Sequence, residues 1–130
     1  MRSRHVSIVI RRGPEVVYAF ASDPGNLPRW AAGLASSTVT WDGDTLYADS
    51  PMGRVAFTFA ADNMLGVLDH DVTLPDGTVV HNPMRVIRHP DGAEVVFTLR
   101  QLGLTDDEFD RDAAMVAADL ARLTGLLEST

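Results

Sequence analysis

The order in which hydrophobic patterns follow one another constrains the fold of this chain more than any other feature. A β-like run at residues 5–10 leads into a helical segment that begins at Pro14, and an amphipathic helix closes the chain from about Thr105. Residues 36–102 carry alternating patterns and turn signals instead. This is the order in which a curved antiparallel sheet wraps around a helix. We therefore predict an α+β fold in which about seven antiparallel strands surround a long C-terminal helix and leave a cavity.

The closing helix has the clearest local signals. Thr105 and Glu108 have the spacing of a capping box, in which each residue bonds the backbone N–H of the other. Apolar residues then recur at alternating steps of four and three and predict one buried stripe: Phe109, Ala113, Val116, Leu120, Leu123 and Leu127. Asp119 and Arg122 are expected to lie off this stripe.

Two short helices are expected after the first strand. Pro14 suits the first position of a helix, and Pro24 ends that helix at the preceding residue. A second helix then carries apolar residues at spacings of three and four, with Gly33 near its end: Leu27, Trp30 and Leu34.

Turn signals divide the middle of the chain into hairpins: Asp42-Gly43, Met52-Gly53, Pro75-Asp76-Gly77 and Asp91-Gly92. A three-residue loop at 75–77 pairs His70 with Asn82 and Asp71 with His81. A loop at Asp91-Gly92 pairs Val86 with Phe97. The face that holds Asp69, Asp71, His81 and Arg85 is charged and must be solvated, so the opposite face is expected to be buried.

His70 and Asn82 are polar residues on the face that is expected to be buried. A buried imidazole or amide without a partner costs about 1–3 kcal/mol, so each must bond the other, water, the backbone or a ligand. His70 is a candidate acid or base, and Asn82 a candidate to orient it or to polarise a carbonyl group. The alternatives are a structural pair and a ligand contact without chemistry.

Large apolar residues on the same face either fill the core or line a cavity that binds a ring system. The candidate ligand-binding residues are Trp30, Trp41, Phe57, Phe59, Leu68, His70, Asn82, Met84, Phe97 and Val116. Trp30, on a short helix, is the candidate for a gate at the mouth of the cavity.

Composition excludes several classes of function. The net charge is −7 and all 11 basic residues are arginine, without a basic stripe, so we expect no nucleic-acid partner and no stable membrane insertion. The chain has no cysteine or lysine, which excludes thiolate and Schiff-base chemistry. It also has no dinucleotide or phosphate-loop motif, and we expect no cofactor. With no leader-like segment in the sequence, a cytoplasmic location is expected.

A metal site is not expected either. Asp69, Asp71 and His81 alternate on the solvated face, and no further ligand of suitable spacing follows them.

The chain resembles the START-like, polyketide-cyclase-like superfamily, often labelled SRPBCC. The resemblance rests on the strand at 8–10, the helix at 14–20, the segment DPGNLPRW at 23–30, the middle hairpins and the closing helix. It covers nearly the whole chain and implies one domain over residues 1–130, with a helix-grip fold and a cavity for a small apolar or amphipathic molecule. The superfamily shares no universal catalytic residues, so it implies no catalytic set here.

Three functions remain open on this basis. The first is a carrier or sensor of a small hydrophobic molecule, with His70 and Asn82 as polar anchors. The second is a polyketide cyclase-like or dehydratase-like enzyme that uses His70 as acid or base. The third is a non-catalytic protein-interaction module. A monomer or a homodimer is expected in each case.

Overall fold

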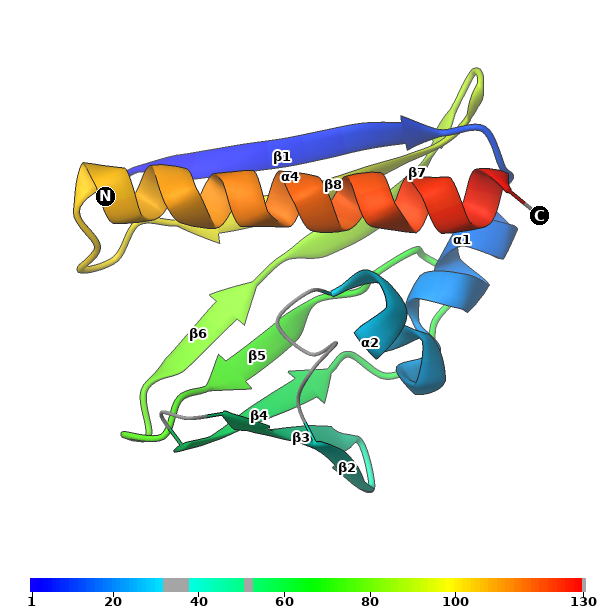
Figure 1. The fold of residues 1–130 in the computed structure, drawn as a ribbon. Helices are drawn as coiled ribbons and strands as arrows, with labels where there is room; N and C mark the ends of the chain where they lie inside the picture. The colour runs from blue at the N-terminus through cyan, green and yellow to red at the C-terminus, as the bar shows by residue number, and fades with distance from the viewer. Residues whose placement is uncertain (32–37, 51–52, 130) are drawn as a thin grey trace.

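The computed structural model describes residues 1–31, 38–50 and 53–129, and it has the predicted α+β architecture (Figure 1). The strands are β1 (Ser3–Ile10), β2 (Thr38–Asp42), β3 (Thr45–Ser50), β4 (Gly53–Phe59), β5 (His70–Thr73), β6 (Val79–Asn82), β7 (Met84–His89) and β8 (Gly92–Arg100). The helices are α1 (Pro14–Ala21), the short 3-10 helix η1 (Pro24–Asn26), α2 (Leu27–Trp30) and α4 (Asp106–Glu128).

The described strands form two antiparallel sheets, with the orders β1-β8-β7 and β2-β3-β4-β5-β6. They are joined where β6 runs into β7 through Pro83, whose carbonyl accepts a bond of 2.9 Å from the N–H of Thr98 on β8. We predicted one strand through this region, and it is divided into β6 and β7 because proline has no N–H to give to a ladder. The described residues thus form eight strands, in agreement with the expected number of about seven.

The register of the hairpin between β5 and β6 is confirmed. His70 pairs with Asn82 and Asp71 pairs with His81. The strand before this turn, β5, is shorter than predicted, because regular strand structure begins only at His70. Leu68, which precedes it, still donates its N–H to the carbonyl of Met84.

The predicted turn between β7 and β8 is wrong by one residue. His89 pairs with Gly92, so the loop is Pro90-Asp91, and Phe97 pairs with Met84 instead of Val86. Proline suits the first loop position, where φ near −65° is required and no N–H is needed. The pairing moves by two residues, and every side chain keeps its face because the strand period is two.

The other hairpins differ from prediction in the same way. The loop between β2 and β3 is Gly43-Asp44, with Gly43 at φ 61°, so Trp41 faces Leu46. Between β3 and β4, Ser50 pairs with Gly53; Met52, predicted in that loop, lies outside the described residues.

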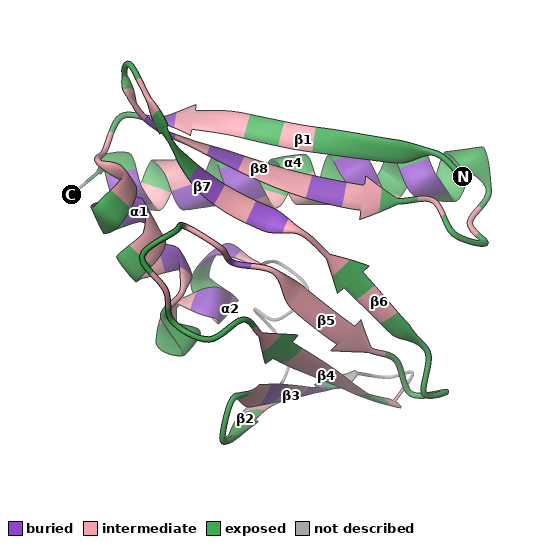
Figure 2. Cartoon of the chain, turned by 180° about the vertical axis from the view of Figure 1, so that it is seen from behind, coloured by how far each residue is buried: buried purple, intermediate pink, exposed green. Residues whose placement is uncertain are grey.

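Helix α4 lies along the sheet that contains β1, β8 and β7, with its buried residues turned toward the strands (Figures 1 and 2). The capping box of Thr105 and Glu108 is confirmed. Five of the six predicted stripe residues are buried, and Val116 is half-buried. Arg2, which precedes β1, and Arg4 on β1 pair with Asp106 and Asp110, at 3.1 and 2.8 Å, and tie the start of the strand to the start of the helix.

The two short helices close one end of the sheet. Val17 and Ala21 of α1 and Leu27 and Trp30 of α2 are buried. The guanidinium of Arg122 on α4 donates to the carbonyl of Trp30 at 2.9 Å, which joins α2 to α4. The predicted continuation of this helix to Gly33 and Leu34 falls outside the described residues.

Among the described residues, no helix has both the length and the apolar character needed to cross a membrane.

Candidate functional site

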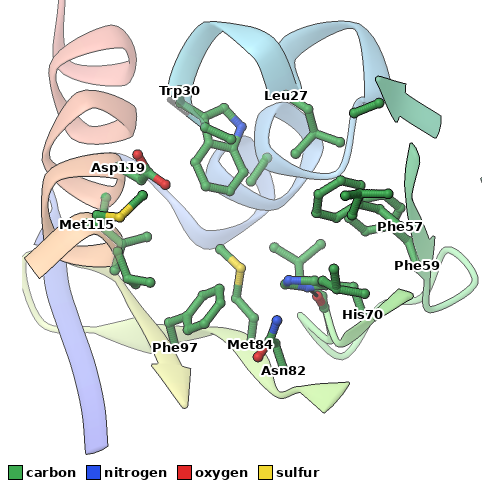
Figure 3. Close-up of a pocket in the computed structure, with 18 residues that line it drawn as sticks. Leu27, Trp30, Phe57, Phe59, His70, Asn82, Met84, Phe97, Met115 and Asp119 are labelled. Atoms are coloured by element: carbon green, nitrogen blue, oxygen red, sulfur yellow. Dashed lines mark hydrogen bonds between the residues drawn. The ribbon is translucent and has the colours of Figure 1, made fainter. Parts of the chain in front are cut away.

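A cavity of about 290 Å³ lies between the curved sheet, helix α2 and the middle of α4 (Figure 3). Strands β3 to β8 each contribute to its wall. Its lining residues are Ala21, Leu27, Trp30, Ala31, Ala48, Val55, Phe57, Phe59, Leu68, His70, Val72, Asn82, Met84, Phe97, Met115, Val116, Asp119 and Leu120. Most of this wall is aliphatic or aromatic.

The structure brings nine of the ten sequence-predicted site residues to this cavity. The exception is Trp41, whose predicted place in the cavity is wrong. Trp41 is 39% exposed, and its ring centroid lies 6.3 Å from that of Phe59. β2 is the edge strand of its sheet, which leaves Trp41 partly open to solvent.

Besides apolar residues such as Leu27 and Leu120, two residues of α4 line the cavity that were not among the predicted site residues. Met115 lines it while remaining 58% exposed, which places Met115 at the rim. Asp119 was expected off the apolar stripe but also lines the cavity, beside Met115 and Trp30 in Figure 3. Asp119 lies three residues after Val116 and four after Met115, so helical spacing alone was the available signal.

The imidazole of His70 is held in one orientation. Its Nδ1 lies 3.1 Å from the carbonyl oxygen of Leu68. The ring stands between Phe59 and Phe97, with centroid distances of 5.5 and 5.6 Å. Burial lowers the pKa of His70 below its ordinary value of 6.5, against the raising effects of the Leu68 carbonyl and the nearby carboxylates. His70 is therefore neutral at neutral pH.

The carboxamide of Asn82 lies opposite His70 across the β5–β6 ladder and also lines the cavity (Figure 3). Within residues 1–31, 38–50 and 53–129 it makes no side-chain hydrogen bond, and its atoms are not sealed off from the cavity. The amide therefore keeps both its donor and its acceptor for a molecule inside.

Trp30 and Met84 shape the middle of the cavity. Trp30 is 7% exposed, and its indole Nε1 is the one buried side-chain nitrogen or oxygen in the described part of the chain without a hydrogen-bond partner. The thioether of Met84, 2% exposed, projects into the space from the sheet (Figure 3). A flexible methionine at this point lets the wall adapt to the shape of a ligand.

The outer face of the same strands is charged, as predicted. Asp71 and His81 are joined at 2.7 Å, and Asp69 pairs with Arg85. Asp69 also accepts the N–H of Met84 at 2.8 Å, which fixes the start of β7. Across the described ranges, no three histidine, aspartate or glutamate side chains are grouped to hold a metal ion.

No family model and no curated protein matches the chain. Solved structures do match. DynU16, from the dynemicin biosynthetic locus, has a TM-score of 0.74 at 14% identity over 97% of this chain, which spans only 47% of the DynU16 chain. A protein from Bacillus thuringiensis has a TM-score of 0.75 at 16% identity, covering 97% of this chain and 98% of its own. The Aha1 dimer from Colwellia psychrerythraea has a TM-score of 0.75 at 18% identity, covering 98% and 97%. These similarities establish the helix-grip fold.

Proposed function

We propose that this protein binds a small hydrophobic or amphipathic molecule in the cavity, as a carrier or sensor. The observation that carries the proposal is the composition of the wall, in which His70, Asn82 and Asp119 are the polar exceptions among apolar residues. Water gains few hydrogen bonds in such a space, whereas an apolar ligand gains about 25 cal/mol for each Å² of surface removed from water. The volume lies near the lower end of the range of roughly 300–1,000 Å³ that is typical of small-molecule sites.

The same proposal places the chain in the START-like, polyketide-cyclase-like superfamily as one domain over residues 1–130. The likeness to DynU16 and to the Colwellia protein supports this placement at the level of fold. The dimer formed by the Colwellia protein is consistent with a monomer or a homodimer here.

A cyclase-like or dehydratase-like enzyme is the second candidate, and His70 is the observation that favours it. A neutral imidazole inside an apolar cavity is a base that can take a proton from a bound substrate and return it elsewhere. Asn82, beside it, can polarise a carbonyl group. The two candidates share one binding site and differ in whether the bound molecule changes.

Native mass spectrometry of the purified protein, followed by extraction and identification of the bound molecule, tests the proposal. We expect a defined adduct in the wild type and its loss in Met84→Trp, because the larger side chain fills the middle of the cavity. Met64→Trp is the matched control, since Met64 is fully exposed and a tryptophan there leaves the cavity unchanged. The control must retain the adduct.

The outcomes separate the candidate functions. An adduct that Met84→Trp retains contradicts binding in this cavity. Turnover of the identified compound that disappears in His70→Phe, while binding persists, favours the enzyme. A protein that stays empty with a library of lipids and aromatic compounds contradicts both and favours an interaction module.

A further inference from the structure

The polar atoms inside the cavity define the chemistry of the molecule that it takes. The carbonyl oxygen of Leu68 only accepts hydrogen bonds, so the Nδ1 of His70 that faces it at 3.1 Å carries the ring proton. In the neutral imidazole the Nε2 atom is then an acceptor. Phe59 and Phe97 pack against the ring, and turning the ring over would break the bond of Nδ1 to the Leu68 carbonyl. The cavity therefore presents a fixed acceptor.

Asn82 adds the complementary donor next to this acceptor. Its carboxamide makes no side-chain hydrogen bond to another described residue and lies across the ladder from His70. A group that satisfies both must donate one hydrogen bond and accept another. A hydroxyl group does so with a single oxygen atom.

The charges around the cavity exclude an anion. The one charged residue among the described lining residues is Asp119, which is itself negative and is paired with Arg122 at 3.1 Å. A ligand carboxylate would meet the lone pair of His70 and the field of Asp119, with no lining cation to compensate its desolvation. Uncharged ligands are favoured on both counts.

The residues of the cavity wall also favour a flat and compact ligand. Aromatic rings line the cavity from α2, β4 and β8, namely Trp30, Phe57, Phe59 and Phe97. The faces and edges of these aromatic side chains pack well against another aromatic ring. A volume of about 290 Å³ suits a compact ring compound better than a long acyl chain.

We infer that the cavity selects an uncharged ring compound whose hydroxyl group donates to His70 Nε2 and accepts from Asn82, and that it rejects carboxylates of the same shape. This inference rests on the proposed binding function and specifies its ligand class. It assigns His70 the role of a hydrogen-bond acceptor that determines specificity.

Equilibrium dialysis with three matched probes tests the inference: 2-naphthol, 2-methoxynaphthalene and 2-naphthoate. The ether keeps the oxygen acceptor but lacks the donor, and the carboxylate adds a negative charge at neutral pH. We expect the wild type to bind 2-naphthol about tenfold more tightly than the other two, which is the effect of one hydrogen bond or one uncompensated charge.

Variants connect the binding of these probes to the two polar residues. His70→Phe keeps a ring between Phe59 and Phe97 and should remove most of the tenfold preference for 2-naphthol over the ether. Asn82→Leu removes the donor to the oxygen atom of both 2-naphthol and the ether, so it should weaken the binding of both probes and leave the preference between them in place. Thermal unfolding verifies that each variant is folded, and in His70→Phe the affinity for the ether is the internal control, since it should change by less than about twofold.

A measurement on the wild type alone keeps the inference testable if a variant does not fold. On acidification His70 becomes an imidazolium, Nε2 becomes a donor, and the affinity for 2-naphthol should fall while that for the ether does not. The other titratable groups near this ring are Asp69 and Asp71 on β5 and His81 on β6, with Asp119 on α4 across the cavity. Asp71→Asn, on the outer face, should leave the difference between the two probes in place.

Equal binding of 2-naphthol and its ether, or tighter binding of 2-naphthoate, would overturn the inference. If Met84→Trp still abolished binding of the probes, the proposed cavity function would stand without this ligand class. If no probe bound although the purified protein carried an adduct, the ligand class would again be wrong. Absence of both probe binding and adduct would overturn the binding function itself.

Discussion

Replacing each of two buried leucines on α4 by alanine tests whether the cavity is present, because one leucine borders the cavity and the other does not. Leu120 and Leu123 are 1% and 0% exposed and belong to the same apolar stripe, but only Leu120 lines the cavity. Replacing a buried leucine by alanine costs about 2–5 kcal/mol, and the amount depends on the contacts that are lost. Part of the Leu120 side chain faces a void and has no partner atoms there to lose. We therefore expect about 2–3 kcal/mol for Leu120→Ala and about 4–5 kcal/mol for Leu123→Ala.

Urea denaturation followed by circular dichroism measures both free energies of unfolding. The two variants should have the same dependence on urea concentration as the wild type, since both unfold the same surface. The protein must be stripped of any bound molecule first, because a ligand would fill the void and raise the cost at Leu120. A loss at Leu120 that equals or exceeds the loss at Leu123 in the stripped protein would refute the reasoning. It would mean that the cavity is closed by packing in solution.

Three further perturbations test the local structure. Thr105→Ala removes the N-terminal cap of α4 and should lower the free energy of unfolding by about 1 kcal/mol, while Thr105→Asp should retain most of it in the same denaturation assay. Gly77→Ala, at φ 89° in open space, should cost about 1–2 kcal/mol. Gly66→Ala should cost distinctly more, because its Cβ would clash with the carbonyl oxygen of Val86; similar losses for both glycines would contradict this packing. Burial lowers the pKa of His70 in the folded state, so its contribution to stability is fully present above pH 6.5 and is lost as the pH falls through the folded-state pKa. His70→Phe should flatten this part of a stability-against-pH curve, and an unchanged slope would show that the histidine is not desolvated.

Local signals were enough to predict α4 and the inward face of the hairpins. The helix has a capping box at one end and an uninterrupted apolar stripe, and both depend only on residues close in sequence. For the hairpins, the exact turn was misplaced around Asp91 and Gly43, yet the buried face was right. A register error of two residues exchanges partners without exchanging faces, because side chains alternate with a period of two.

The features that sequence reasoning missed depend on what covers each face. Alternation placed Trp41 on the inward side of β2, but it could not show that β2 is the edge strand of its sheet and leaves Trp41 exposed. Asp119 was expected to lie off the apolar stripe, and it nevertheless borders the cavity beside Met115. Pro83 did carry a readable signal, since a proline within an apparent strand argues for an interruption.

The pairing of His70 with Asn82 followed from the turn alone, but the state of the imidazole did not. That state depends on the carbonyl of Leu68 and on the rings of Phe59 and Phe97, and the last of these comes from a different hairpin. Sequence reasoning thus located the polar pair, and the three-dimensional arrangement showed which atom is left for a ligand.

The measurement that tests the central claim most directly is a ¹H–¹⁵N NMR titration of the protein with 2-naphthol. The account predicts saturable shifts that are largest for the amides of His70, Asn82, Met84 and Phe97, and that disappear in Met84→Trp but persist in Met64→Trp. Absence of saturable shifts, or shifts centred on the exposed tip at Met64 and Leu65, would contradict a binding site in the cavity.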